Sequence, residues 1–164
     1  MILIIILFLI IEMKNNIIRS IKLEKHDTKD ILDGHINGSL TVIWRDWDKI
    51  INVEPKMVYV SSVNPGETKG PHLHTKRDSY FVCIRGKVIF ITKDSDGKYC
   101  EIESSEENPV LVQIPKNLPS AHINITDKTA TILTLTNLAW RPNDNEMQNV
   151  IFNDYDWNKW KSTD

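Results

Sequence analysis

Residues 65–86 read PGETKGPHLHTKRDSYFVCIRG, and two histidines stand near the middle of this stretch. In an extended strand residues i and i+2 point to the same face, so His72 and His74 project together, either into a barrel or out to solvent. Glycines flank the pair at positions 66 and 86. The stretch therefore predicts a strand that carries two neighbouring imidazoles on one face.

The chain from Leu40 onward is a series of short apolar or alternating runs, rich in Val, Ile, Thr and aromatic residues. Gly and Pro mark the turns between them, because Gly frees φ and Pro fixes it. Regularly spaced strands without amphipathic helices predict an all-β antiparallel sandwich or barrel. The expected strands cover residues 40–44, 57–63, 80–84, 87–92, 110–114, 121–125 and 129–135.

The length and charge of the chain exclude several classes of protein. A chain of 164 residues has the usual size of one domain. Its 20 Lys and Arg balance 22 Asp and Glu, so it lacks the excess cation of a nucleic-acid binder. The two cysteines, Cys83 and Cys100, form no CxxC pair, which predicts a reducing, cytoplasmic location and a buried Cys83.

Residues 1–20 are predicted as an apolar N-terminal extension, and residues 21–164 as a single domain. The run from Met1 to Ile11 is entirely apolar, but a bilayer needs about 20 such residues, so no membrane span is expected. Two interpretations are favoured: an edge strand that pairs with another subunit, or an extension upstream of a start at Met13. An uncleaved anchor is a third.

The two histidines and their flanking glycines match the spacing of the first cupin motif. A second cupin-like segment, residues 114–124, supplies His122. The resemblance implies a cupin jelly roll, a double-stranded β-helix barrel, with all three histidines in its lumen. Ser79 stands where metal-binding cupins carry a ligating Glu, and Asp78 is the nearest carboxylate.

Two chemistries are open to such a set of histidines. His72, His74 and His122 could hold a divalent transition metal such as Zn, Fe or Mn. Without the Glu, however, the set is neutral and lacks a hard oxygen ligand. We therefore favour metal-free acid and base chemistry without a cofactor, for which the ordinary pKa of His near 6.5 is well suited.

The segment Lys69-Gly70-Pro71-His72 resembles the Arg-Gly-x-His segment of the dTDP-4-dehydrorhamnose 3,5-epimerase family. Similar landmarks follow at residues 112–115, at His122, at residues 141–142 and in a tryptophan-containing tail, so the resemblance spans roughly residues 33–160. It implies a nucleotide-sugar substrate, no metal and a homodimer. In that family the motif His is the catalytic base.

The resemblance thus implies an epimerase or isomerase acting on a dTDP-4-keto-6-deoxy sugar in carbohydrate biosynthesis, with His72 as the base and Lys69 at the enolate oxygen. Trp140 stands where the family has a catalytic Tyr, which favours a single-centre epimerase or a keto-isomerase. Reprotonation would come from water, His74, Tyr59 or Tyr80. The expected substrate-binding residues are Tyr59, His74, Lys76, Arg77, His122 and Trp140.

The sequence also allows other functions and other roles for some of these residues. The protein could be a metal-dependent cupin enzyme or a non-catalytic sugar-binding cupin, and Lys76 and Arg77 could meet a diphosphate or form a solvated loop. Trp44 and Trp47 could line the mouth of the barrel, although core positions are favoured.

Two further segments carry structural predictions. Residues 22–33 are expected to form a helical turn or, preferably, an exposed solvated connector. The tail at residues 154–160 is expected to be a short helical or irregular segment that Trp157 and Trp160 pin to the barrel.

Overall fold

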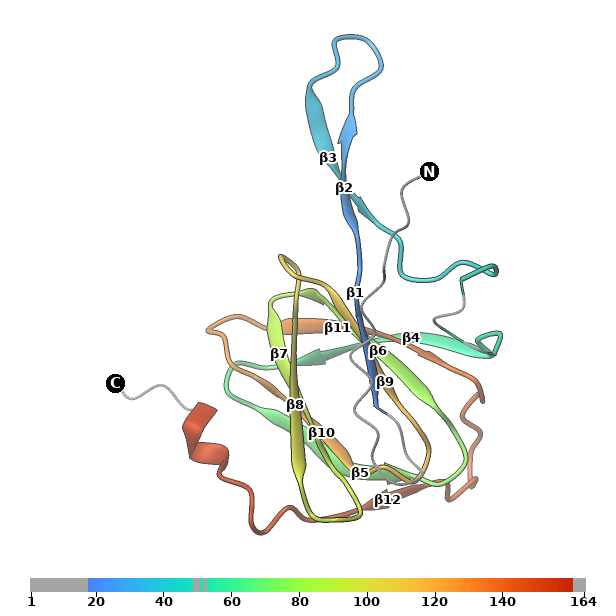
Figure 1. Ribbon diagram of the computed structural model, residues 1–164, viewed down its shortest axis with the longest axis vertical. Helices are drawn as coiled ribbons and strands as arrows, with labels where there is room; N and C mark the ends of the chain where they lie inside the picture. Colours follow the sequence, from blue (N-terminus) through green and yellow to red (C-terminus); the bar gives the residue numbers. More distant parts are fainter. Residues whose placement is uncertain (1–17, 49–50, 52, 161–164) are drawn as a thin grey trace.

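The computed structural model describes residues 18–48, 51 and 53–160. Two five-stranded antiparallel sheets form a sandwich, from which a two-stranded hairpin projects (Figure 1). The first sheet has the strand order β1-β9-β6-β11-β4, and the second has the order β12-β5-β10-β7-β8. The all-β jelly-roll prediction is confirmed.

The first sheet contains β1 (Arg19–Lys22), β4 (Met57–Val63), β6 (Ser79–Arg85), β9 (Val110–Ile114) and β11 (Ala130–Thr136). The second contains β5 (Thr68–His74), β7 (Lys87–Lys93), β8 (Tyr99–Ser105), β10 (Ser120–Asn124) and β12 (Met147–Asn149). The strands expected at 57–63 and 110–114 have these bounds, and those expected at 80–84, 87–92, 121–125 and 129–135 differ by a residue or so at their ends. The motif around His72 and His74 is β5, whereas β1, β8 and β12 were not anticipated.

The alternation of side chains along β7 separates two hydrophobic clusters. Val88 and Phe90 face the core between the sheets, while Ile89 and Ile91 face outward and join the C-terminal tail. This is the period of two that a strand imposes. Cys83 lies in the inner core with no exposed surface, so its predicted burial is confirmed, and burial raises the pKa of its thiol to about 11.

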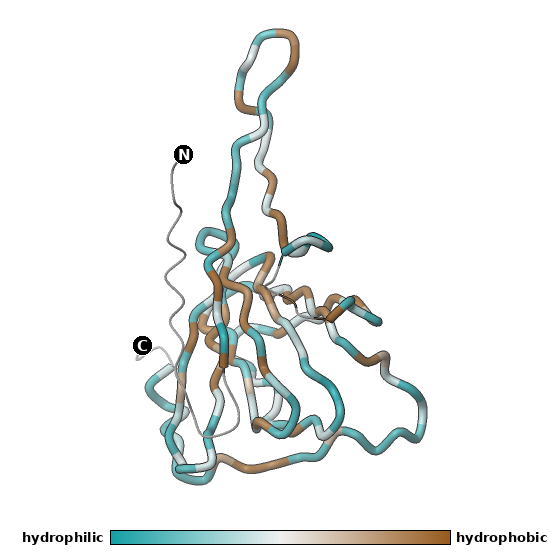
Figure 2. The backbone as a smooth tube through the Cα atoms, turned by 45° about the vertical axis from the view of Figure 1, so that its right-hand side comes forward, coloured by the Kyte–Doolittle hydropathy of each residue, from teal (hydrophilic) through white to brown (hydrophobic). Residues whose placement is uncertain are grey.

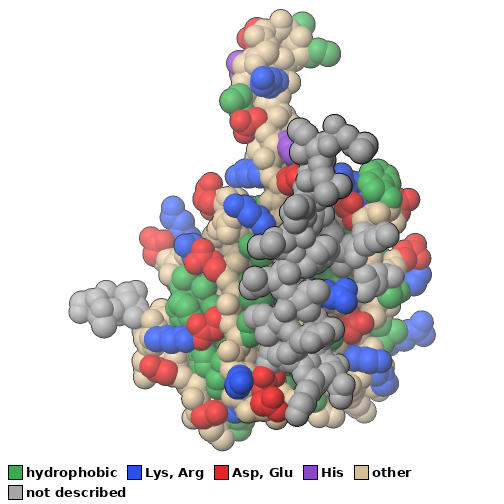
Figure 3. Space-filling view, viewed as in Figure 1, with side chains coloured by type: hydrophobic (Ala, Val, Ile, Leu, Met, Phe, Trp, Pro, Cys, Tyr) green, Lys and Arg blue, Asp and Glu red, His purple; other side chains and the backbone are tan. Residues whose placement is uncertain are grey.

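The segment expected as a helical turn or connector is a strand. Residues 22–33 include β2 (Lys25–Lys29), which pairs with β3 (Ile36–Thr41) in the hairpin that rises from the barrel. The exposure was anticipated, because these strands are mostly exposed. The sequence did not predict a strand here. The backbone hydrogen bonds of β2 are made with β3, and no local pattern in residues 22–33 indicates that pairing. Figure 2 shows hydrophobic positions at the hairpin tip, and Figure 3 shows the hairpin standing clear of the barrel surface.

The strand predicted at residues 40–44 ends at Thr41, because the chain leaves the hairpin there. Trp44 packs beside Tyr80 and Val82 on the outer face of the first sheet, so the core interpretation holds for this residue. It is wrong for Trp47, which is 73% exposed and has the Arg45 guanidinium over its ring.

The predicted boundary at residue 20 falls inside a strand. Ile18 is buried in the core, and β1 begins at Arg19 and pairs with β9. The predictions for residues 1–17 lie outside the described residues. In the ranges that the structure describes, no helix is both long and apolar enough to cross a membrane.

We predict that Gly70→Ala strongly destabilises the barrel. Gly70 has φ +88°, and an added Cβ would lie 2.8 Å from the Ser120 carbonyl oxygen on β10. Gly66 is the matched control, since its φ is +69° and nothing lies within 4 Å of an added Cβ. Both variants should lose about 1 kcal/mol through the left-handed backbone, and Gly70→Ala about 2 kcal/mol more through the clash. Urea unfolding measures both, and equal losses would contradict the prediction.

Candidate active site

A cavity of about 250 Å³ lies between the two sheets. Its walls come from β4 and β6 on one side and from β5, β10 and β12 on the other. The register of the β5–β10 pair shifts between Ser120 and His122. Residues of both strands line the cavity at this irregularity. The lining residues are Tyr59, Ser61, Lys69, His72, His74, Arg77, Phe81, Ser120, His122 and Met147.

His72 lines this cavity, and among the described residues its ring has a hydrogen-bond partner at Nδ1 and none at Nε2. Its Nδ1 lies 3.1 Å from Asn149 Oδ1, which belongs to the residue directly opposite His72 across the β5–β12 pair. An amide oxygen only accepts hydrogen bonds, so Nδ1 carries the proton and donates. In the neutral ring this places the lone pair on Nε2, which is the arrangement that a general base requires.

His74 is held in a different state. Its Nδ1 lies 3.0 Å and 3.1 Å from the two carboxylate oxygens of Glu146, and its Nε2 lies 3.2 Å from an Arg77 guanidinium nitrogen. Since guanidinium only donates, Nε2 accepts and the ring is neutral. Burial and the Arg77 charge lower the pKa of His74, against an opposing effect of Glu146. Its lone pair is thus already engaged.

Glu146 is the centre of this arrangement. The carboxylate is 2% exposed, and its Oε1 lies 3.3 Å from Arg77 Nε in an ion pair. A buried charge of this kind needs a charged partner and hydrogen bonds, which Arg77 and His74 provide. Arg77 is therefore committed to the cavity wall rather than placed in a solvated loop.

Glu146 and Asn149 have roles in this site that no sequence pattern predicted. Both lie more than 70 residues beyond the histidines that they contact. Asn149 belongs to a strand of three residues without apolar alternation, and Glu146 immediately precedes that strand. Only the pairing of β12 with the edge of β5 brings them to the site. No local signal in the sequence indicates that pairing.

His122 is enclosed by aromatic rings. Its ring centroid lies 5.5 Å from that of Phe90 and 6.2 Å from that of Phe81, and its Nε2 is buried without a hydrogen-bond partner among the described residues. Burial, helped by the nearby charge of Lys69, lowers the pKa of His122 to about 3. It stays a neutral part of the wall at any ordinary pH.

The other predicted residues divide into two groups. Tyr59 and Lys69 line the cavity, on β4 and β5. Lys76 does not, and pairs with Asp144 at 3.2 Å. Trp140 is also outside the lining and is 59% exposed. Tyr80 lies on the opposite face of β6, where its hydroxyl accepts a hydrogen bond from Gln113, so it does not reach the cavity.

The donor set does not fit a divalent metal held by the three histidines. His74 has both nitrogens engaged, one of them by a guanidinium cation, and His122 Nε2 is sealed among aromatic rings. Asp78, the nearest carboxylate in sequence, accepts hydrogen bonds from the Lys116 backbone and the Asn137 amide instead. Within the described ranges, the one group of three such ligand atoms within 4.8 Å of one another is Asp30, Asp33 and His35 in the hairpin.

The fold and the cavity define a cupin-type barrel with histidine side chains lining its lumen. A family model described as FdtA: WxcM-like, C-terminal matches residues 19–156. The chain belongs to this WxcM-like family. A search of curated proteins found no match.

Solved structures share the fold at low sequence identity. A dTDP sugar isomerase from Desulfovibrio desulfuricans G20 has a TM-score of 0.75 and 15% identity over 88% of this chain and 92% of that one. QdtA, a sugar 3,4-ketoisomerase from Thermoanaerobacterium thermosaccharolyticum solved with TDP, has a TM-score of 0.61 and 24% identity over 80% and 86%. NovW, a 4-keto-6-deoxy sugar epimerase from Streptomyces spheroides, has a TM-score of 0.68 and 15% identity over 87% and 72%.

We predict that His122 makes the fold sensitive to acid. Its folded pKa of about 3 lies below the ordinary 6.5, so the unfolded chain binds the extra proton first as the pH falls. This stabilising contribution is complete above pH 6.5 and is lost between pH 6.5 and about 3. Its size is on the order of 4 to 5 kcal/mol.

The test is urea unfolding across this pH range for the protein and for His122→Phe, which keeps a ring between Phe81 and Phe90. The variant should lose less stability on acidification, by about 4 to 5 kcal/mol. His26→Phe, in the exposed hairpin, is the matched control and should follow the unaltered protein. Parallel curves for all three proteins would contradict the prediction.

Proposed function

We propose that the protein is an isomerase or epimerase of a dTDP-linked 4-keto-6-deoxy sugar, and that His72 removes a proton from the carbon next to the ketone. The observation that carries this proposal is the free Nε2 of His72 in the cavity, with the proton of the ring fixed on Nδ1 by Asn149. A ketone acidifies the neighbouring C–H bond, which brings it within reach of a neutral imidazole.

The first step transfers the C–H proton to His72 Nε2, and the electron pair of that bond forms the enolate. Lys69 is the cationic side chain of the lining that remains available for the enolate oxygen, because Arg77 is engaged with Glu146. A fixed cation at a developing oxyanion lowers the barrier more than water does. His74 stays neutral and positions the wall beside the base.

The second step returns a proton. Tyr59 lies on β4, in the sheet across the cavity from His72, and is the tyrosine among the lining residues. Donation from Tyr59 to the opposite face of the same carbon gives the epimer. Return of the proton by His72 to the former carbonyl carbon, together with transfer of the C3 hydroxyl proton to the O4 oxygen, moves the ketone from C4 to C3 instead. Tyr59 thus offers a phenol proton, which Trp140, at the position of the family's catalytic Tyr, cannot donate.

The structural neighbours support the substrate class. One is a dTDP sugar isomerase, one is a 3,4-ketoisomerase solved with TDP, and one acts on 4-keto-6-deoxy sugars. These three proteins suggest both reactions, epimerisation and ketone migration, as outcomes for this cavity. We expect the protein to need no metal for either.

The experiment is the incorporation of deuterium from D2O into dTDP-4-keto-6-deoxyglucose, followed by NMR, with protein treated with chelator. Exchange at C3 or C5 is expected, and ketone migration would appear as a new product. His72→Asn should slow exchange by about 10²–10⁴-fold, the usual contribution of a general base. Tyr59→Phe should slow product formation more than exchange if it donates the second proton.

The matched control is His26→Asn in the hairpin, which should exchange at the rate of the unaltered protein. Activity that disappears with chelator and returns with a divalent cation would favour a metal-dependent enzyme. Tight binding of the sugar nucleotide without exchange would favour a sugar-binding protein. Either outcome would refute His72-mediated proton abstraction.

We also propose a homodimer that uses the outer face of the first sheet. Val58 and Val60 on the edge strand β4 are 57% and 58% exposed and lie opposite Leu135 and Leu133 of β11. An exposed apolar edge is a common interface between subunits. Because Tyr59 and Ser61 alternate with these valines, the interface would lie directly behind the cavity wall.

Light scattering after gel filtration should give twice the mass of the 19.0 kDa chain. The double variant Val58→Lys and Val60→Lys should weaken the dimer at least about 100-fold, because it would place like charges at the interface. Ile31→Lys with Leu32→Lys, at the exposed hairpin tip, is the control. A monomeric protein, or dissociation by the control alone, would contradict the proposal.

A further inference from the structure

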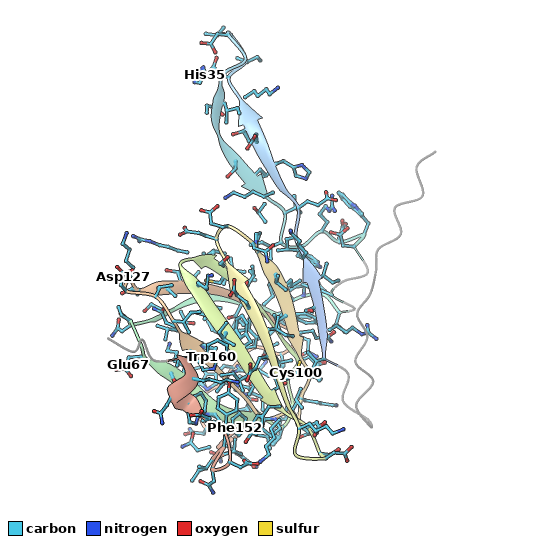
Figure 4. All side chains as sticks on the ribbon, turned by 60° about the vertical axis from the view of Figure 1, so that its left-hand side comes forward. His35, Glu67, Cys100, Asp127, Phe152 and Trp160 are labelled. Carbon is cyan, nitrogen blue, oxygen red and sulfur yellow. The ribbon has the colours of Figure 1, made fainter. Side chains whose placement is uncertain are left out.

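A C-terminal strap, residues 150–160, crosses the outer face of the second sheet after β12. Figure 1 shows it running from β12, at one edge of that sheet, to the 3-10 helix η1 (Trp157–Trp160) beside the barrel, and Figure 4 labels Phe152 and Trp160 along this path. Phe152 and Tyr155 are buried against the sheet, and Trp157 and Trp160 pack around them. The predicted packing of the tail tryptophans is confirmed.

Polar contacts fasten the strap to the far strands of this sheet. Asp154 Oδ1 accepts hydrogen bonds from Lys93 Nζ and from the Tyr99 hydroxyl, both at 2.6 Å. These two donors lower the pKa of Asp154 to about 2. The Asp154 clasp thus joins the strap to β7 and β8.

A second clasp centres on Glu101 of β8. Its Oε1 accepts a hydrogen bond from the Tyr155 hydroxyl at 2.8 Å and pairs with Lys159. The Tyr155 hydroxyl in turn accepts a hydrogen bond from Trp160 Nε1 at 2.8 Å. Lys159 also lies over the rings of Tyr155 and Trp160. The Glu101 carboxylate is the contact that this clasp makes with β8, through the Tyr155 hydroxyl and the Lys159 ammonium.

β12, by contrast, is weakly held by itself. It is an edge strand of three exposed residues that pairs only with β5 among the described strands. The residues on either side of β12 add two backbone hydrogen bonds: the Thr75 N–H donates to the Glu146 carbonyl, and the Val150 N–H donates to the Pro71 carbonyl. Yet Glu146 and Asn149, which hydrogen-bond to His74 and His72 respectively, belong to this short segment.

We infer that the strap is a positioning device for the active site: the clasp of Tyr155 and Lys159 on Glu101 holds β12 against β5 and thereby fixes Asn149 on His72 and Glu146 on His74. Glu101 and Tyr155 touch neither the cavity nor any reacting atom, and lie on the outer face of the sheet. They act through β12, and their effect on turnover rests on the proposed function, whereas their effect on the histidines does not.

The chain offers a matched pair of variants. Glu101 and Glu103 lie two residues apart on the same strand, and Glu103 pairs with Lys87 at 3.2 Å without contacting the strap. Glu101→Ala should speed amide hydrogen exchange at Val150 and Thr75 by at least about tenfold, the effect of losing a charged hydrogen bond. Glu103→Ala should leave both amides unchanged.

The second readout is the NMR titration of His74. Glu146 holds the pKa of His74 up against the effects of burial and Arg77, so displacement of Glu146 in Glu101→Ala should lower this pKa further. A loss of packing alone would lower the melting temperature without moving either this pKa or the Val150 amide. Tyr155→Phe should reproduce the direction of both changes, because it removes the same contact.

The results separate the two proposals. If the pKa and the exchange rates change as expected while no form of the protein exchanges sugar protons, the strap inference stands and the proposed function fails. If the unaltered protein is active and Glu101→Ala has the same kcat, the same His74 pKa and the same Val150 exchange as Glu103→Ala, the strap inference is overturned.

Discussion

The buried carboxylate of Glu146 is the constraint on which the cavity depends. A charge that is 2% exposed is tolerated only with a cation and hydrogen-bond donors beside it. Arg77 supplies the cation, His74 supplies a donor, and the position of each is fixed by the other two. This arrangement makes one of the two motif histidines a structural partner and leaves His72 as the ring with a free nitrogen.

The sequence predicted the barrel more completely than it predicted the site. Strands such as β4 and β9 are apolar runs between strong turn signals, so the local pattern fixes them. The period of two placed His72 and His74 together, and the same rule accounts for Tyr59 lining the cavity while Val58 and Val60 face outward. These inferences needed no knowledge of which strands are neighbours.

What the sequence did not reveal depends on pairing between distant segments. β2 is polar on both faces and exists as a strand through β3, and β12 is three exposed residues that pair with β5. The partners of the two histidines therefore remained hidden, and Trp140 was placed at the substrate only through the family resemblance. In the structure its side chain is exposed, and a phenol from another strand, Tyr59, occupies the cavity.

Two consecutive residues of β6 face opposite sides of the first sheet. Tyr80 belongs to the cluster on the outer face of the first sheet, and Phe81 forms part of the cavity wall. Inserting or deleting a single residue before this point would exchange the two surfaces, because every later side chain of the strand would change sides. The hairpin turn at Asp30–Gly34 carries no such requirement. Length variation among related chains should therefore accumulate in the hairpin and be rare at the start of β6.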